Sequence, residues 1–135
     1  MDYTNSQTIP FESVDYNHGL QVAKGLLKLT KSGIELEYQV QDSFVGVIKS
    51  DVKNLHLDYK DLDSIDFKKG WFSAKIILKA TSMRVLQDLP GNELGECKLK
   101  VKRRHKDKAQ QTISRARVAL SEFKLDQLGE GDSDQ

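Results

Sequence analysis

The chain has one cysteine and two prolines among 135 residues, and it has no long apolar run. Its single cysteine, Cys97, excludes an intrachain disulfide and cannot form a thiolate metal site alone. With only nine glycines as well, the composition excludes collagen and low-complexity sequences. The longest stretch without a polar residue, Phe44–Ile48, is far shorter than the roughly 20 apolar residues of a membrane-spanning helix. No apolar segment follows Met1, so we expect no secretory signal peptide and a cytoplasmic location.

What the chain does have is an uneven distribution of charge. The net charge is +1, but residues 1–66 have a balance of −5, residues 67–128 of +9, and residues 129–135 of −3. Such asymmetry indicates an anion-binding face, unless folding interleaves the two halves. A mass of 15.3 kDa suits one domain, which we place at residues 20–128. We expect residues 1–19 to be a lead-in segment and residues 129–135 to be a disordered acidic tail.

Alternation of apolar and polar residues predicts the strands. It is clearest in residues 34–41, and in residues 96–102, where Cys97, Leu99 and Val101 face inward. Weaker patterns predict further strands: these are residues 20–29, residues 54–59, a strand from Ile65, residues 74–80 and, least clearly, residues 83–86. Residues 30–33 fit a hairpin turn, and residues 89–92 fit a type II turn. Residues 1–19 contain either a short strand or an irregular lead-in, and the sequence does not decide between them.

After residue 106 the apolar residues change to a helical spacing. The stripe consists of Ala109, Ile113, Ala116, Leu120 and Phe123. Asp107 fits the N-cap position with Gln110 completing a capping box, and Gly129 fits the C-terminal end, so we expect a helix from Asp107 to about Gln127. The predicted fold is therefore mainly β. We expect a partly open barrel or sandwich of about seven antiparallel strands, capped by one C-terminal helix.

This order of elements, with several local segments, resembles the pleckstrin homology-like superfamily, especially its small bacterial and GRAM-type domains. The segments that carry the resemblance are residues 25–30, 34–38 and 59–66, the Pro90-Gly91 turn, and residues 98–103 running into the helix. The resemblance implies a scaffold that hosts many functions, mostly binding ones.

Phosphoinositide-binding members carry a Lys…Lys/Arg-x-Arg pattern around the first hairpin. The corresponding region here has Lys24, Lys28 and Lys31 without an arginine. Because recognition of several phosphates favours arginine forks, we do not expect phosphoinositide binding.

The basic run between Lys98 and Lys108 is the candidate anion-binding segment. Its candidate residues are Lys98, Lys100, Lys102, Arg103, Arg104 and Lys106. They indicate a site for a membrane surface, a nucleic acid or an acidic protein. The alternative, which we favour, is that the lysines are outward strand positions and the arginines a solvated connection. No aromatic residue in the run can stack on a base, so we do not expect nucleic-acid binding.

Two apolar segments are candidates for binding a partner, with Phe44 and Val45 in one and Trp71 and Phe72 in the other. An exposed apolar patch marks an interface, and the two together favour self-association into a homo-oligomer. In the alternative, which we favour slightly, Phe72 turns inward in phase with Ala74, and Trp71 covers the barrel mouth.

Catalytic motifs are absent from the sequence. His18, His56 and His105 lack the spacing of a metal-binding pair, and there is no nucleophile elbow, phosphate loop or CxxC motif. We expect no catalytic residues, cofactor or metal. The predicted function is a non-enzymatic binding or assembly domain for a protein partner or a second copy. The alternatives are a peripheral membrane module that uses the basic run and, third, a small enzyme.

Overall fold

The computed structural model describes residues 8–13, 21–42 and 51–133. The elements in chain order are β1 (Thr8–Ser13), β2 (Gln21–Leu29), β3 (Gly33–Asp42), β4 (Lys53–Asp58), η1 (Tyr59–Asp61), β5 (Leu62–Lys69), β6 (Ser73–Ala80), η2 (Met83–Leu86), β7 (Glu96–Lys102), η3 (Arg103–His105) and α2 (Lys106–Ser133). The η elements are short 3-10 helices. The prediction of a mainly β fold of seven antiparallel strands followed by one C-terminal helix is confirmed.

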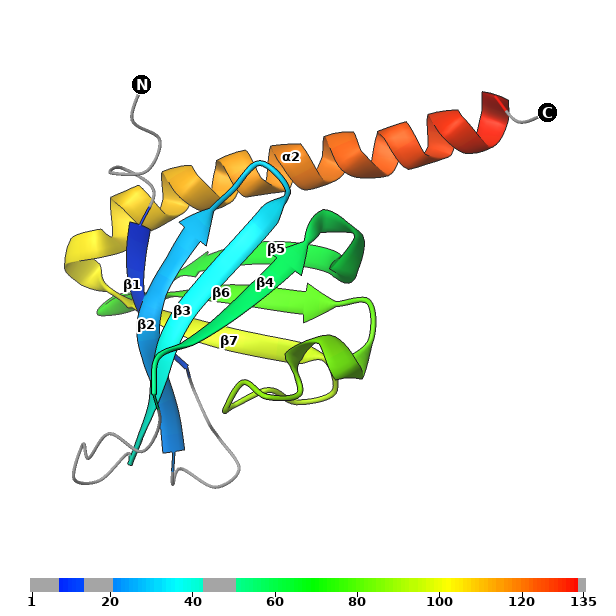
Figure 1. Cartoon of the computed structure of the whole chain (residues 1–135). Helices are drawn as coiled ribbons and strands as arrows, with labels where there is room; N and C mark the ends of the chain where they lie inside the picture. The colour runs from blue at the N-terminus through cyan, green and yellow to red at the C-terminus, as the bar shows by residue number, and fades with distance from the viewer. Residues whose placement is uncertain (1–7, 14–20, 43–50, 134–135) are drawn as a thin grey trace.

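The seven strands of the described residues belong to one sheet in the order β4-β3-β2-β1-β7-β6-β5, and within these residues the sheet does not close. It has two parts, β1 to β4 and β5 to β7, whose strands run at a steep angle to each other (Figure 1). The strand that joins the two parts is β1, which pairs with β2 on one side and β7 on the other. Helix α2 lies across the top of the sheet in this view.

Strand β1 comes from the segment whose structure the sequence left undecided. Ile9 and Phe11 alternate with the outward Pro10 and Glu12, and both apolar side chains are buried in the core. Ser13 is buried as well, and its hydroxyl oxygen accepts a hydrogen bond from the backbone N–H of Ala23 at 2.9 Å. A buried hydroxyl needs such a partner, so this bond holds the end of β1 against β2.

The strongest alternating patterns lie where the sequence places them. Cys97, Leu99 and Val101 are fully buried on the inner side of β7, as predicted. On β2, a Cβ atom added to Gly25 would lie 1.9 Å from the Glu37 carbonyl oxygen. The absence of a side chain at Gly25 therefore allows β2 and β3 to approach closely at this point.

The predicted helical stripe packs on the sheet, mainly against β5. Its first four members, Ala109, Ile113, Ala116 and Leu120, are buried, and Phe123 is partly buried. The Phe123 ring contacts the Tyr59 ring, with 6.3 Å between their centroids. One residue further, the Lys124 ammonium donates a 2.5 Å hydrogen bond to the Asp63 carbonyl of β5. These contacts hold α2 against the sheet from Ala109 to Lys124.

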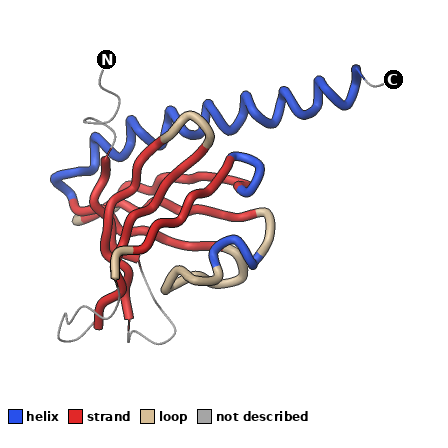
Figure 2. The backbone as a smooth tube through the Cα atoms, in the orientation of Figure 1, coloured by secondary structure: helices blue, strands red, loops and turns tan. Residues whose placement is uncertain are grey.

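Both ends of α2 differ from the prediction. The helix begins at Lys106, directly after η3, so Asp107 lies in the first turn and is not the N-cap. At the other end the helix continues through Gly129 to Ser133 and extends beyond the strands (Figure 2). A glycine ends a helix by adopting a positive φ, and Gly129 does not do so. In a helical conformation it costs only about 1 kcal/mol relative to alanine.

The segment Met83–Leu86 is a 3-10 helix and not the weak strand that the sequence suggests. Its N–H groups bond three residues back, and a further bond joins the Leu89 N–H to the Leu86 carbonyl at 3.0 Å. Leu86 and Leu89, three residues apart, are both fully buried, which a turn allows and a strand period of two does not. The turn that follows is confirmed, because Gly91 has φ 86° and the Asn92 N–H bonds the Leu89 carbonyl.

The central position of β1 gives the first prediction. Ile9→Ala removes a fully buried side chain, so we expect the free energy of unfolding to fall by about 2–5 kcal/mol. Val52→Ala truncates an exposed β-branched side chain and should change it by less than about 0.5 kcal/mol. Urea denaturation measures both. Equal midpoints for Ile9→Ala and the wild type would mean that β1 is not part of the core.

The helix gives a second prediction with its own matched pair. Ile113→Ala should destabilise the chain by about 2–5 kcal/mol, because Ile113 faces the sheet and is buried. Val118→Ala, on the exposed side of the same helix, should be close to neutral. Thermal unfolding followed by circular dichroism compares them. A neutral Ile113→Ala variant would separate α2 from the sheet.

Candidate binding surfaces at the β7–α2 corner

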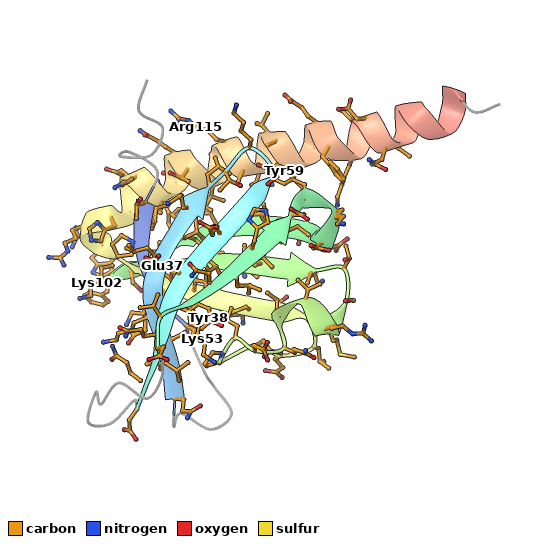
Figure 3. The ribbon with its side chains drawn as sticks, in the orientation of Figure 1. Glu37, Tyr38, Lys53, Tyr59, Lys102 and Arg115 are labelled. Atoms are coloured by element: carbon orange, nitrogen blue, oxygen red, sulfur yellow. The ribbon has the colours of Figure 1, made fainter. Side chains whose placement is uncertain are left out.

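The candidate anion-binding residues occupy the end of β7 and its passage into α2. Lys98, Lys100 and Lys102 are outward positions of β7, and Arg103 and Arg104 are exposed in η3. Lys102 lies where the chain leaves the sheet for the helix (Figure 3). The outward placement expected for the strand lysines is therefore correct. It does not distinguish a solvated strand from a binding site.

A pocket of about 290 Å³ lies at this corner, and three of the candidate residues line it. These are Lys100, Lys102 and Arg104, while Lys98, Arg103 and Lys106 do not line it. The other lining residues come from β1, β2 and η3: Pro10, Phe11, Glu12, Lys24, Gly25 and His105. Residues from four elements therefore line this pocket, which we call the seam pocket.

Strand register explains why these side chains meet. On the outer surface of the sheet, Glu12 of β1 lies opposite Lys24 of β2 and opposite Lys100 of β7. The Glu12 carboxylate is 3.5 Å from the Lys24 ammonium. Cross-strand neighbours lie within about 5.5 Å of each other, so one carboxylate stands between two lysines. The cations in the pocket therefore outnumber its single acid.

The hydrogen bond and the pKa of His105 both reflect the positive charge of this corner. The Arg104 Nε–H donates to His105 Nε2 at 3.2 Å, so that ring nitrogen is an acceptor and the imidazole is neutral. Partial burial lowers the His105 pKa below its usual 6.5, and the positive charges of Arg104, Lys108 and Lys102 lower it further. The site is thus positive enough to disfavour another cation.

The positive charge continues across the sheet from the pocket. Lys100 is paired with Lys75 of β6, and Lys75 is paired with Lys68 of β5. Like charges directly opposite each other on neighbouring strands are destabilising. Cations at the start of α2 are likewise unfavourable next to the positive end of the helix dipole. Positive charge is therefore concentrated along this end of the sheet.

The aromatic pair Trp71 and Phe72 forms the tip of the β5–β6 hairpin. The last backbone pair of this hairpin is Lys69–Ala74, and the Gly70 N–H bonds the Ser73 carbonyl at 2.7 Å. Trp71 and Phe72 are therefore the two central residues of the turn. Trp71 is 80% exposed and Phe72 is 78% exposed. The interpretation that Phe72 turns inward is wrong, because the strand period does not extend into the loop. The rings contact only edge to face, with 6.5 Å between centroids.

The hairpin tip and the seam pocket lie at the same end of the sheet. Ser73, next to Phe72, is paired with Lys102 at the last position of β7. Lys68 and Lys69 flank the tip on the other side and are exposed. We call this combination the aromatic–basic end. The other predicted partner-binding residues, Phe44 and Val45, lie outside the described residues.

A serine of the β2–β3 turn also meets a histidine and an aspartate of β4, but not as a catalytic triad. Ser32 Oγ lies 3.0 Å from His56 Nε2, and Asp58 Oδ1 lies 2.9 Å from the same nitrogen. A triad needs the carboxylate on one ring nitrogen and the nucleophile on the other. Within residues 8–13, 21–42 and 51–133, no three His, Cys, Asp or Glu side chains are placed to hold a metal ion.

The sequence analysis did not assign the other six lining residues to a site, and three of these, Glu12, Lys24 and His105, have polar side chains. Lys24 and Glu12 are far from the basic run along the chain, and only the pairing of β1 with both β2 and β7 brings them to it. The basic run was the available signal for His105, because His105 is the one histidine among the lysines and arginines of that run.

Comparisons with protein-family models, with curated proteins and with solved structures find no match for this chain. In the part of the chain that the structure describes, no helix combines the length and apolar character needed to cross a bilayer.

Cys97 gives a third prediction. Burial raises the pKa of its thiol to about 12, with a smaller contribution from the nearby Glu96 carboxylate. The folded protein should therefore keep the thiol protonated at pH 8 and react slowly with a thiol reagent. Reaction should become fast in denaturant. Rapid reaction in native buffer, at the rate of the unfolded chain, would contradict the buried position of Cys97.

Proposed function

We propose that this chain is a non-enzymatic binding domain on a pleckstrin homology-like scaffold, and that it docks through the aromatic–basic end on an anionic membrane surface. The observation that carries the proposal is the exposure of Trp71 and Phe72 at a hairpin tip surrounded by cations. The succession of seven strands and a C-terminal helix supports the scaffold.

Turn formation does not require aromatic residues at the tip. Short hairpin loops favour Gly, Asn, Asp and Pro, each for a conformational reason that Trp and Phe do not share. Two large apolar side chains in water are unfavourable unless a partner covers them. At the boundary between water and acyl chains the Trp and Phe rings leave water, so this unfavourable free energy is removed. The Trp N–H stays in the polar layer.

The charges beside the tip suit a lipid surface. Lys68 and Lys69 precede it, Lys102 and Arg103 lie next to it across the strand pair, and the sequence has no acid from Phe67 to Gln87. Each basic residue near an anionic leaflet contributes about 1 kcal/mol. The cytoplasmic leaflet is the one rich in anionic lipid, so the expected cytoplasmic location is part of the proposal.

Self-association or a protein partner is the second candidate, and the same exposed pair favours it. Two copies that met tip to tip would bury the aromatic rings but would bring Lys68, Lys69 and Lys102 of both copies together. Like charges brought together across an interface oppose association. A membrane surface covers the rings and neutralises the lysines at the same time, so the geometry favours the membrane.

Vesicle binding tests the proposal directly. The wild type should sediment with phosphatidylcholine vesicles that contain phosphatidylserine, and added salt should release it by screening the attraction. Trp71 is the only tryptophan, so its emission should shift to the blue on binding. The double variant Trp71→Ala, Phe72→Ala should bind at least about tenfold more weakly, because full burial of one such side chain is worth about 1.5–3 kcal/mol.

The matched control is Leu94→Ala. Leu94 is 81% exposed but precedes β7 at the opposite end from Lys102, so its loss should not change vesicle binding. Lys68→Glu with Lys69→Glu should remove most of the salt-sensitive binding. Self-association would replace the membrane proposal if the wild type stays in the supernatant when vesicles are pelleted but is a dimer by sedimentation of the free protein. The Trp71→Ala variant should then be a monomer.

A further inference from the structure

The seam pocket exists because β1 and β7 separate. Among the described residues they pair at Ser13–Leu99 and Glu12–Lys100, and the pairing does not continue to Pro10. Pro10 has no backbone N–H to donate to a neighbouring strand. Beyond this point η3 carries Arg104 and His105 over the gap, which leaves the cavity of about 290 Å³ between them and the sheet.

Four cations from three elements line this cavity against one carboxylate. Lys24 comes from β2, Lys100 and Lys102 from β7, and Arg104 from η3, while Glu12 is the acid. With His105 neutral, the pocket has an excess of three positive charges. A monoanion would leave most of this charge uncompensated, whereas a dianion compensates two-thirds of it.

We infer that the seam pocket binds a phosphate group in its dianionic, phosphomonoester form. Arginine offers a planar fork that bonds two oxygens of a phosphate, and lysines add point charges around the remaining oxygens. The volume lies at the lower end of the range for small-molecule sites, about 300–1,000 Å³, which suits one phosphorylated group. The inference goes beyond membrane docking and stands without it, because Trp71 and Phe72 do not line the pocket.

His105 has a defined part in this site. In the free protein its Nε2 accepts the Arg104 Nε–H, and Arg104, Lys102 and Lys108 disfavour its protonation. A bound dianion would offset two of the three excess positive charges left by Lys24, Lys100, Lys102, Arg104 and Glu12, and so weaken the repulsion on a protonated His105. Protonation of His105 is then less unfavourable, and a protonated ring can donate a further hydrogen bond to the phosphate. The His105 pKa should therefore rise when phosphate binds.

The test is a nuclear magnetic resonance titration with inorganic phosphate at constant ionic strength, with chloride as the competing anion. We expect saturable shifts at the amides of Lys24, Lys100 and Arg104, and an upward shift of the His105 pKa. Arg104→Gln should weaken phosphate binding about tenfold or more, because it removes the fork. Arg103→Gln removes the same charge from the neighbouring residue, which does not line the pocket, and should change the affinity less than about twofold.

Equal loss in the two arginine variants would overturn the inference, because it would assign the effect to general surface charge. Linear shifts without saturation, or an unchanged His105 pKa, would also overturn it. The variant spectra in phosphate-free buffer establish that both proteins are folded. Trp71→Ala with Phe72→Ala should leave the phosphate titration unchanged, so failure of the membrane proposal and failure of this site are distinguishable.

Two vesicle compositions identify where the phosphate comes from. Phosphatidic acid presents a phosphomonoester, and phosphatidylserine at matched surface charge presents a phosphodiester. If Arg104→Gln removes a preference for phosphatidic acid, the ligand is a lipid headgroup. If inorganic phosphate binds but neither composition is preferred, the ligand is a phosphorylated small molecule. Both results support a phosphate site, whereas tight binding of phosphatidylserine with no response to inorganic phosphate overturns it.

Discussion

The pairing of β1 with β2 on one side and β7 on the other is the interaction on which the rest of the structure depends. It connects two groups of strands that run at a steep angle and that, in the part of the chain the structure describes, are joined within the sheet at β1 alone. The connection is short. It holds because Ile9 and Phe11 are buried in the core, and because the Ser13 hydroxyl bonds Ala23 of β2 beyond the last backbone pair, Glu12–Lys24. Where this pairing to β7 ends, the seam pocket begins.

The corner between β7 and α2 combines structural costs that point in one direction. Lysines face each other across β5, β6 and β7, and arginines lead into the positive end of a helix dipole. An anionic partner turns the same repulsions into attraction. The exposed aromatic tip beside this corner has the same property, because it is unfavourable in water and favourable when covered.

The sequence predicts those elements whose pattern is set by burial on one side. Ile113 and Leu99 recur with the correct period, and both are buried as expected. It leaves β1 undecided, because the alternation of Ile9 and Phe11 is short, Pro10 is unfavourable inside a strand, and the place of β1 depends on strands more distant in the chain. Phe72 was misplaced because a strand period was extended into a loop. The pocket is not predicted from the sequence for a related reason. Lys24 and Arg104 line the same pocket only because of the register of three strands.

The aromatic tip and the seam pocket lie at one end of the sheet but depend on different free energies. Covering Trp71 removes apolar surface from water, which salt does not screen. Attraction to Lys100 or Arg104 falls as ionic strength rises, least for groups held inside a cavity. The pairing of Ser73 with Lys102 fixes the two sites relative to each other through backbone hydrogen bonds. A surface that meets both sites therefore gains from the second contact without the full entropic cost of a separate binding event, provided that its phosphate and its apolar layer match this fixed geometry.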